Sequence, residues 1–192
     1  MKKIFIILLI ILLSACYENN KNNDDVYYYK HFMERMLENR EVEYLSNGWY
    51  CPEIKNITLL INDTLTLEKI LQKEKEAVFF RFSDSECIDC IDAELQTINN
   101  MEISERNHVY FLVSYSNMRN LKINLDKYKG FINRVFLVDN RFLDIKVEKL
   151  NIPYYFKVNR NYFIYNVFIP FKSDPEFSKV FLQIKAKINR LP

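Results

Sequence analysis

The chain has 192 residues, 49% of them hydrophobic and 27% charged, which is the balance of a globular domain and not of a disordered chain. Only 2 residues are glycine, so a glycine-rich phosphate-binding loop is excluded, and with it a dinucleotide or P-loop site. The net charge of +2 arises from interspersed acidic and basic residues, without the basic patch of a nucleic-acid-binding protein.

The N-terminal residues predict a targeting segment. Two lysines precede an unbroken apolar run at residues 4–13, which is too short to settle across a bilayer but typical of a secretory signal peptide. The run ends in Leu-Ser-Ala-Cys, which resembles the lipobox of bacterial lipoproteins. The resemblance implies that residues 1–15 are removed and that Cys16 carries a diacylglycerol on its thiol and a fatty acid such as palmitate on its amine. Ordinary secretion, or an uncleaved anchor with Cys16 incidental, is the alternative.

Residues 16–25 are rich in Asn, Lys and Asp, and they predict a flexible tether because such a stretch cannot bury apolar area. The expected location is the bacterial cell envelope, with the chain lipid-anchored to a membrane and its domain in the periplasm or at the cell surface, where disulfides can form. Tyr17 stands where an Asp often retains lipoproteins at the inner membrane of enteric bacteria, which favours the outer membrane.

Residues 26–192 are expected to form one α/β domain with an N-terminal helical extension. Helical periodicity and capping residues predict helices at 26–45, 63–73, 87–100, 121–128 and 175–190. Short apolar runs predict strands at 57–61, 77–82, 108–115, 134–138, 154–158 and 162–169, the last two forming a hairpin. The alternation predicts a sheet covered by helices on both faces. The apolar face of the first helix is expected to pack on the domain.

Cys87 and Cys90 form a C-x-x-C motif directly after the best strand candidate. If Cys87 sits in the first turn of the following helix, the two thiols lie one turn apart on the same side, and a disulfide can join them without large strain. The positive end of the helix dipole stabilises a thiolate, the nucleophilic form. This geometry makes Cys87 the attacking thiol and Cys90 the resolving one. Candidate caps for the helix are Ser83, Asp84 and Ser85.

A buried strand, a short loop, C-x-x-C at a helix start and a later Ile152-Pro153 before a hairpin together resemble the thioredoxin-like superfamily, over roughly residues 58–190. The resemblance implies a thioredoxin-like fold, with a central mixed β-sheet flanked by helices and an extra N-terminal helix. It also implies dithiol–disulfide exchange at Cys87 and Cys90 with no organic cofactor. Finally, it implies a cis peptide bond before Pro153, whose loop shapes the groove for a substrate chain.

Two departures from the thioredoxin pattern bear on the redox chemistry. Residues 86–90 read Glu-Cys-Ile-Asp-Cys in place of Trp-Cys-Gly-Pro-Cys, and Arg81 stands where thioredoxins bury an acid on the preceding strand. Arg81 cannot take a proton from the resolving thiol, and an inward guanidinium would lower a thiol pKa. Four nearby carboxylates would raise it, which leans toward a reductant. They belong to Asp84, Glu86, Asp89 and Asp92.

Other interpretations of single residues stay open. A metal site is not expected, because no second C-x-x-C exists and His31 and His108 lack ligand spacing. A purely structural disulfide is possible. Cys51 is expected to be a buried small hydrophobe, with a third exchanging thiol as the alternative. Of the adjacent Tyr154 and Tyr155, one is expected to pack and the other to be exposed.

The sequence therefore predicts a membrane-anchored thiol–disulfide oxidoreductase that reduces protein disulfides. The Cys87 thiolate would attack a substrate disulfide, and Cys90 would then release the reduced substrate. The expected partners are protein thiols or disulfides, an unidentified reductant and the membrane, with no nucleic acid. The alternative is a redox-inactive thioredoxin-fold lipoprotein that acts as a binding or scaffold module.

Overall fold

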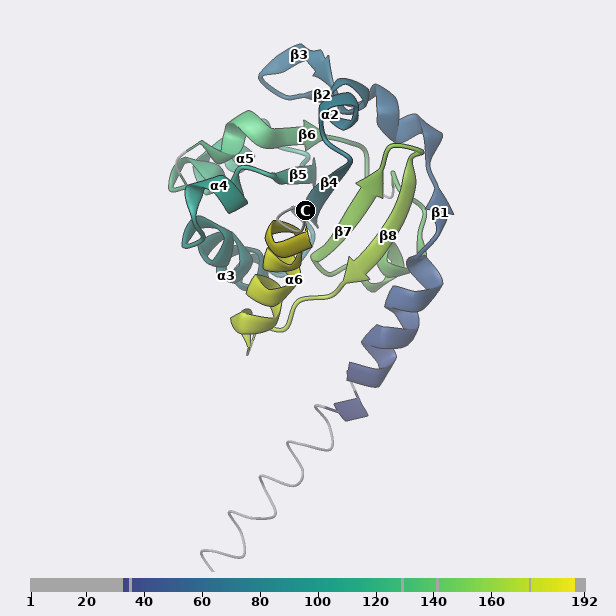
Figure 1. Cartoon of the computed structure of the whole chain (residues 1–192). Helices are drawn as coiled ribbons and strands as arrows, with labels where there is room; N and C mark the ends of the chain where they lie inside the picture. Colours follow the sequence, from purple (N-terminus) through teal and green to yellow (C-terminus); the bar gives the residue numbers. More distant parts are fainter. Residues whose placement is uncertain (1–32, 35, 129, 141, 173, 189–192) are drawn as a thin grey trace, which may run out of the picture. The chain divides into compact units, whose positions relative to one another are not determined.

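The computed structural model describes residues 33–34, 36–128, 130–140, 142–172 and 174–188 (Figure 1). The predicted signal peptide, the lipidated Cys16 and the tether lie outside the described residues. The chain divides into two units, Met1–Glu41 and Val42–Pro192, and the second contains the sheet and both cysteines of the C-x-x-C motif. None of the described helices combines the length and the apolar character that crossing a membrane requires.

The described part of the second unit contains an eight-stranded mixed sheet with the order β1-β8-β7-β4-β5-β6-β2-β3 (Figure 1). The central strand β4 pairs in parallel with β5 and antiparallel with β7, and β7 and β8 form the predicted hairpin. The strands are β1 (Trp49–Tyr50), β2 (Thr58–Leu59), β3 (Asn62–Thr66), β4 (Glu76–Ser83), β5 (Val109–Ser114), β6 (Val135–Leu137), β7 (Tyr154–Asn159) and β8 (Phe163–Phe168).

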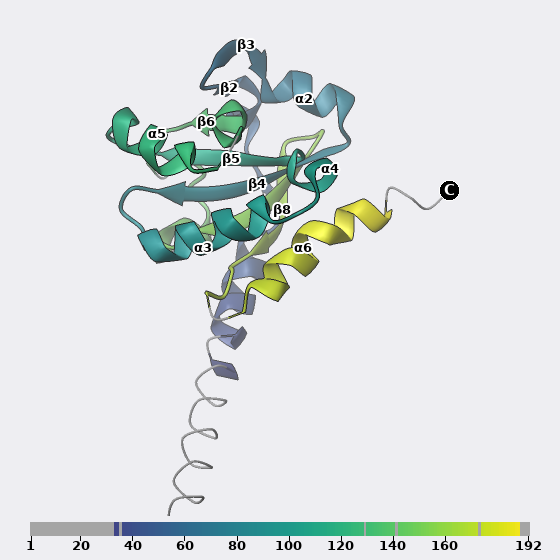
Figure 2. The same cartoon turned by 90° about the vertical axis from the view of Figure 1, so that its left-hand side faces the viewer.

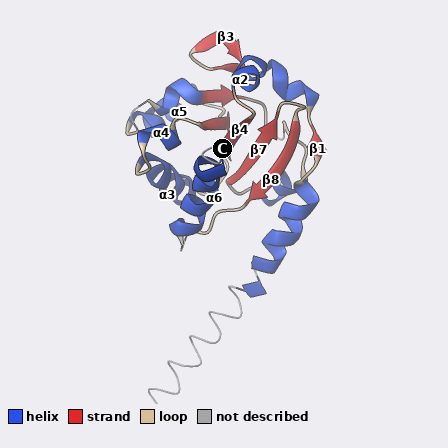
Figure 3. Ribbon diagram, in the orientation of Figure 1, coloured by secondary structure: helices blue, strands red, loops and turns tan. Residues whose placement is uncertain are grey.

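Helices cover both faces of this sheet, as Figures 2 and 3 show from two sides. One core contains buried side chains of α3, α5 and α6, and the other contains buried side chains of α2 and of two 3-10 helices, η1 and η3. The helices are η1 (Pro52–Asn56), α2 (Leu67–Lys73), α3 (Ile88–Asn99), α4 (Ile103–Arg106), α5 (Met118–Asp126), η2 (Phe131–Arg134), η3 (Lys146–Leu150) and α6 (Pro175–Ile188). The expected α/β class, a mixed sheet flanked by helices, is confirmed.

The alternation of side chains along β4 explains why both faces need cover. Phe79 is fully buried in the core beneath α2 and stacks on Phe156, with ring centroids 5.2 Å apart. Phe80 points to the other face, where it is buried beneath α3 and stacks on Tyr155 at 4.7 Å. Burying each such ring contributes about 2 kcal/mol to folding, so β4 is held from both sides.

Two predicted helix starts are wrong by several residues, because the capping residue differs from the expected one. Residues 62–66 form β3, and α2 begins only after Thr66, whose side chain accepts a hydrogen bond from the N–H of Lys69. Helix α5 starts three residues earlier than predicted, because Asn117 caps it by accepting bonds from two N–H groups of the first turn.

The helix before β1 ends at residue 46, close to its predicted end. The prediction that its apolar side chains pack on the domain is wrong for the last turn. Tyr44 and Leu45 are exposed, whereas Glu43 and Ser46 are buried. The Glu43 carboxylate accepts a hydrogen bond from the N–H that follows β8, and the Ser46 hydroxyl accepts one from an N–H of η3. Polar residues face inward here because they satisfy backbone groups that need a partner.

Candidate functional site

The cysteine pair lies where the central strand β4 gives way to helix α3. Cys87 is the N-cap residue of α3 and not a member of its first turn, since its backbone is extended at φ −61° and ψ 105°. Its Sγ accepts a hydrogen bond from the N–H of Cys90 at 3.3 Å, so sulfur takes the position usually held by a Ser or Asp oxygen. The positive end of the helix therefore acts directly on this sulfur.

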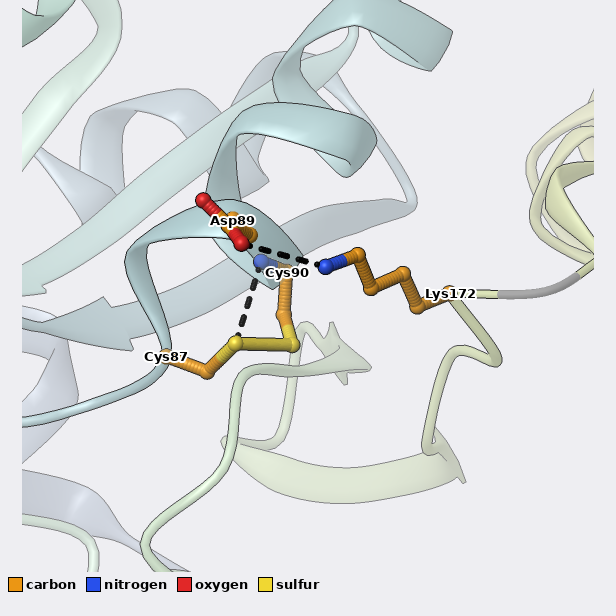
Figure 4. Close-up of a disulfide and its surroundings, with 4 residues drawn as sticks. All are labelled: Cys87, Asp89, Cys90 and Lys172. Carbon is orange, nitrogen blue, oxygen red and sulfur yellow. Dashed lines mark hydrogen bonds and ion pairs between the residues drawn. A yellow bond between two sulfur atoms is a disulfide. The ribbon is translucent and has the colours of Figure 1, made fainter.

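A disulfide joins Cys87 to Cys90, with their Cα atoms 5.3 Å apart (Figure 4). Cys87 is exposed and Cys90 is half-buried. Between them, Ile88 is 61% exposed, although its helical spacing had placed it with the buried Ile91. The N-terminal turn of α3 thus presents one accessible sulfur and one apolar side chain to the solvent.

The carboxylates that the sequence placed around the cysteines are engaged with partners. Asp89 pairs with Lys172, which reaches over from the segment between β8 and α6, with an Nζ to Oδ2 distance of 3.2 Å (Figure 4). Asp92 pairs with Lys127 at 2.6 Å. Both pairs lie at the surface, so each lysine offsets part of the negative charge that would disfavour a thiolate.

Asp84 ties the ends of two parallel strands together. Its Oδ2 accepts hydrogen bonds from the backbone N–H and the hydroxyl of Ser116, which follows β5. These two bonds hold the pKa of the Asp84 carboxyl below its ordinary value. The predicted capping role for Asp84 is therefore wrong, because its side chain points to the neighbouring strand end.

Arg81 is buried on the face of the sheet opposite α3, where it meets an acid that the sequence did not reveal. Its Nε donates to Glu148 Oε1 at 2.9 Å, and its Nη1 donates to the carbonyl oxygen of Phe82 at 2.8 Å. Tyr154 donates its hydroxyl to the same Glu148 oxygen at 2.7 Å. Glu148 comes from η3, 67 residues away along the chain, so no local motif could have signalled it.

Glu86, directly before Cys87, is a largely buried acid. Its Oε1 lies 3.1 Å from the Ser83 hydroxyl, and its Oε2 is buried with no hydrogen-bond partner among the described residues. Burial raises the pKa of Glu86 to about 7, although the Arg81 guanidinium acts in the opposite direction. A carboxyl group that titrates near neutrality therefore adjoins the exposed cysteine.

The loop before β7 meets the cysteine loop through Asn151. The Asn151 Oδ1 accepts from the Ser85 hydroxyl at 3.2 Å, and its Nδ2 donates to the Ser85 carbonyl oxygen at 3.3 Å. These bonds tie Asn151, the residue before Ile152 and Pro153, to the loop that leads to Cys87. Ile152 is half-buried and Pro153 is buried.

The cis peptide bond expected before Pro153 is wrong: the described residues contain none. The chain turns instead at Asn151, which adopts the left-handed conformation with φ 53° and ψ 46°. Asparagine tolerates this region better than most residues, so the sharp change of direction precedes Ile152 and leaves its bond to the proline trans.

The other residues singled out in the sequence are packed in the core or lie near a carboxylate. Tyr154 and Tyr155 are both buried, which corrects the expectation that one is exposed, because β7 is an inner strand covered on both faces. Cys51 is buried and burial raises its pKa, as fits a small hydrophobe. His108 lies 3.4 Å from a carboxylate oxygen of Glu74, and the described residues contain no cluster of three metal ligands.

A central parallel β4–α3–β5 unit, an adjacent antiparallel hairpin and a disulfide at the start of α3 define this fold as thioredoxin-like. No protein-family model and no curated protein matches the chain. Among solved structures, the reduced N-terminal domain of PilB from N. meningitidis is 10% identical, with 68% of this chain and 93% of that chain covered and a TM-score of 0.46.

Two further structures show a similar level of likeness. DsbF of MTB is 12% identical, with 57% of this chain and 80% of that chain covered and a TM-score of 0.37. The N-terminal domain of PilB from Neisseria gonorrhoeae is 9% identical, with coverage of 61% and 80% and a TM-score of 0.39. What the chain does is therefore inferred from its own residues.

Proposed function

We propose that this chain is a thiol–disulfide oxidoreductase in which Cys87 and Cys90 exchange disulfides with protein substrates. The main support is that Cys87 is an exposed N-cap residue of α3 and forms a disulfide with the half-buried Cys90. A cysteine at a helix N-terminus is stabilised as the thiolate, and exposure gives a large substrate access to it. Exchange needs no bound cofactor, because the electrons reside in the two thiols.

The exchange proceeds in two displacements. The Cys87 thiolate bonds to one sulfur of a substrate disulfide and expels the other as a thiolate, which takes a proton from water. Cys90 then loses its proton, bonds to Cys87 and expels the second substrate sulfur. Two electrons pass to the substrate, and the protein is left with the disulfide seen in the structure. An external reductant must restore the thiols.

We propose that the physiological direction is reduction of the substrate. Asp89 lies two residues after Cys87, and a nearby carboxylate disfavours a thiolate. The lysine paired with Asp89 is itself more than half exposed, so water screens its compensating charge. The Asp89 carboxylate thus offsets part of the stabilisation that the start of α3 gives the thiolate, and a less stabilised reduced form gives up electrons more readily, the opposite of the situation in strongly oxidising disulfide proteins.

The test is a redox titration of the full chain in detergent against glutathione and dithiothreitol buffers, with thiols counted by alkylation. We expect a reversible two-electron couple near or below about −250 mV, and a value of about −120 to −180 mV would make the protein an oxidant or isomerase instead. Cys51→Ser is the matched control and should retain the couple. A pair that never exchanges would favour the redox-inactive binding lipoprotein.

The order of attack can be tested separately. We propose that Cys90→Ser traps substrates as mixed disulfides on Cys87, whereas Cys87→Ser traps none. Trapping by Cys87→Ser alone would reverse the assignment. We further propose that Ile152 and Pro153, held beside the cysteine loop by Asn151, shape the groove in which the substrate chain lies.

We propose that the chain is lipidated at Cys16 and anchored in the bacterial cell envelope, with the outer membrane favoured by Tyr17. The support is the order of charge, apolar run, small residues and cysteine in residues 1–16. Labelled palmitate should enter the wild-type chain but not Cys16→Ser, and the wild-type protein should sediment with outer-membrane vesicles. Equal membrane retention of both forms, without label, would overturn the proposal.

A further inference from the structure

Four polar side chains form a continuous line of contacts from the cysteine loop to the loop before Pro153. Glu86 Oε1 lies 3.1 Å from Ser83 Oγ, and Ser83 Oγ lies 2.9 Å from Ser85 Oγ. Ser85 Oγ in turn lies 3.2 Å from Asn151 Oδ1. Three contacts thus connect the acid next to Cys87 with the residue that turns the chain before the proposed groove.

The orientation of the last contact is set by the backbone. The Asn151 Nδ2 donates to the Ser85 carbonyl oxygen at 3.3 Å. Rotating the amide would place its oxygen against that carbonyl oxygen, so Oδ1 must face the Ser85 hydroxyl as an acceptor. A hydrogen bond between the Ser85 hydroxyl and Asn151 Oδ1 therefore needs the Ser85 proton.

The number of hydrogen bonds along the line depends on the protonation state of the acid. Each hydroxyl carries one proton and can donate once. With the Ser85 proton given to Asn151, the contact between Ser83 and Ser85 is a hydrogen bond only if Ser83 donates its proton to Ser85 Oγ. The contact between Ser83 and Glu86 then lacks a proton unless the carboxyl group supplies it. All three contacts are hydrogen bonds only when Glu86 is protonated; an ionised Glu86 draws the Ser83 proton to itself and interrupts the line.

The surroundings of Glu86 favour the protonated form near neutral pH. Its second oxygen is buried without a partner among the described residues, which costs a neutral acid less than a carboxylate. Burial is also the main cause of its raised pKa, which Arg81 and the hydrogen bonds of Ser83 lower and Glu148 raises. The remaining titratable groups that sense its charge are Tyr154 of β7 and Tyr115 after β5.

We propose that Glu86, acting through Ser83 and Ser85, is a protonation-dependent positioning residue for Asn151, and so holds the backbone before Pro153 beside Cys87. When Glu86 loses its proton, Ser83 donates to the carboxylate, and Ser83 Oγ is left as an acceptor 2.9 Å from Ser85 Oγ, nearer than Asn151 Oδ1 at 3.2 Å. The Ser85 hydroxyl then turns to Ser83, and the groove loses one of its two ties to the cysteine loop. The consequence for substrates rests on the proposed function, since it assumes that Ile152 and Pro153 line the groove.

The link itself is tested by NMR on the oxidised full chain in detergent micelles, from about pH 5 to about pH 9. We expect the Asn151 side-chain amide shift to follow the Glu86 carboxyl titration with the same midpoint. Glu86→Gln should hold the Asn151 signal at its low-pH position at every pH, because a glutamine amide always has a proton for Ser83. In Ser85→Ala, Glu86 should still titrate while Asn151 ceases to respond.

An Asn151 signal that ignores the Glu86 titration in the wild type, or still follows it in Ser85→Ala, would overturn the link. The functional arm measures KM for a disulfide-bonded protein across the same pH range. KM should rise about fivefold as Glu86 ionises, the loss expected for one hydrogen bond, and should stay constant in Glu86→Gln. Coupled NMR titrations without any disulfide exchange would reject the proposed function and leave the link standing.

Discussion

Two neighbouring tyrosines on β7 show two ways of burying a carboxylate in this sheet. Tyr154 faces the core beneath α2 and donates its hydroxyl to Glu148 at 2.7 Å, whereas Tyr155 faces α3 and donates to Glu94 at 2.8 Å. Glu148 also accepts hydrogen bonds from the Arg81 guanidinium. Among the described residues, no cation is paired with Glu94, although it is 2% exposed.

The difference shows how the protein manages buried charge. A guanidinium beside Glu148 compensates an ionised carboxylate, so that face keeps a salt bridge. On the other face, burial raises the pKa of Glu94 and favours the neutral acid, which hydroxyl groups can satisfy without a cation. Glu86 lies between these cases, because it senses the charge of Arg81 without a direct bond to it.

The largest expected effect comes from removing the cation. Arg81→Met leaves Glu148 buried without its ion-pair partner, and the free energy of unfolding should fall by about 3–5 kcal/mol. Urea unfolding measures the change. Adding Glu148→Gln to Arg81→Met should restore most of the loss, and a double variant no more stable than the single one would refute the pairing argument.

Next in size is the pH dependence contributed by Glu86. Its pKa is about 7 in the folded protein against an ordinary value of 4.5, so the folded state binds the proton more tightly. Stability from this group is fully present below about pH 4.5 and is lost as pH rises toward 7, by up to about 3 kcal/mol. Glu86→Gln should remove this slope. Parallel unfolding profiles for the two proteins from about pH 4 to 8 would contradict it.

The hydroxyl groups of Tyr154 and Tyr155 should differ in their contribution to the free energy of unfolding. Tyr155→Phe deprives Glu94 of the hydroxyl that donates to it at 2.8 Å and should cost about 2 kcal/mol. Tyr154→Phe should cost less than about 1 kcal/mol, because Glu148 keeps the Arg81 bonds. Chemical unfolding of both variants at neutral pH makes the comparison, and an equal cost would show that the cation does not distinguish the two faces.

The smallest effect is expected at the surface. Lys127 pairs with Asp92 at 2.6 Å, yet the two side chains are 47% and 33% exposed. Lys127→Ala should therefore change the free energy of unfolding by less than about 1 kcal/mol, and added salt should shrink even that. A loss comparable to that of Arg81→Met would mean that exposure is a poor guide to the strength of ion pairs here.

The parts of the fold that could be predicted from the sequence are those with strong local signals. The apolar runs predicted β4, β5 and the β7–β8 hairpin, and the C-x-x-C motif located the site at the start of α3. The missed strands were β1, with two residues, and the polar β3, because their strand character comes from pairing with neighbours and not from a pattern of their own.

The polar contacts of the site could not be predicted in the same way. Glu148 lies more than sixty residues from its partner Arg81 in sequence, and Asn151 lies similarly far from its partner Ser85. An isolated acid or amide in a turn carries no sequence signal that identifies its partner. The raised pKa of Glu86 likewise depends mainly on its burial in the folded chain. Motifs identified the reacting sulfurs, whereas their surroundings needed the folded chain.

The outer edge of β8 has a consequence for how the molecule behaves at high concentration. The strand β1 covers β8 at only two residues. Farther along, the side chain of Asn47 accepts from the N–H of Val167, and that of Glu43 accepts from the N–H of Ile169. An open strand edge invites another chain to add to the sheet, which leads to aggregation. Two polar side chains thus occupy donors that a second molecule would need, so their loss would leave those N–H groups open to pairing with another chain.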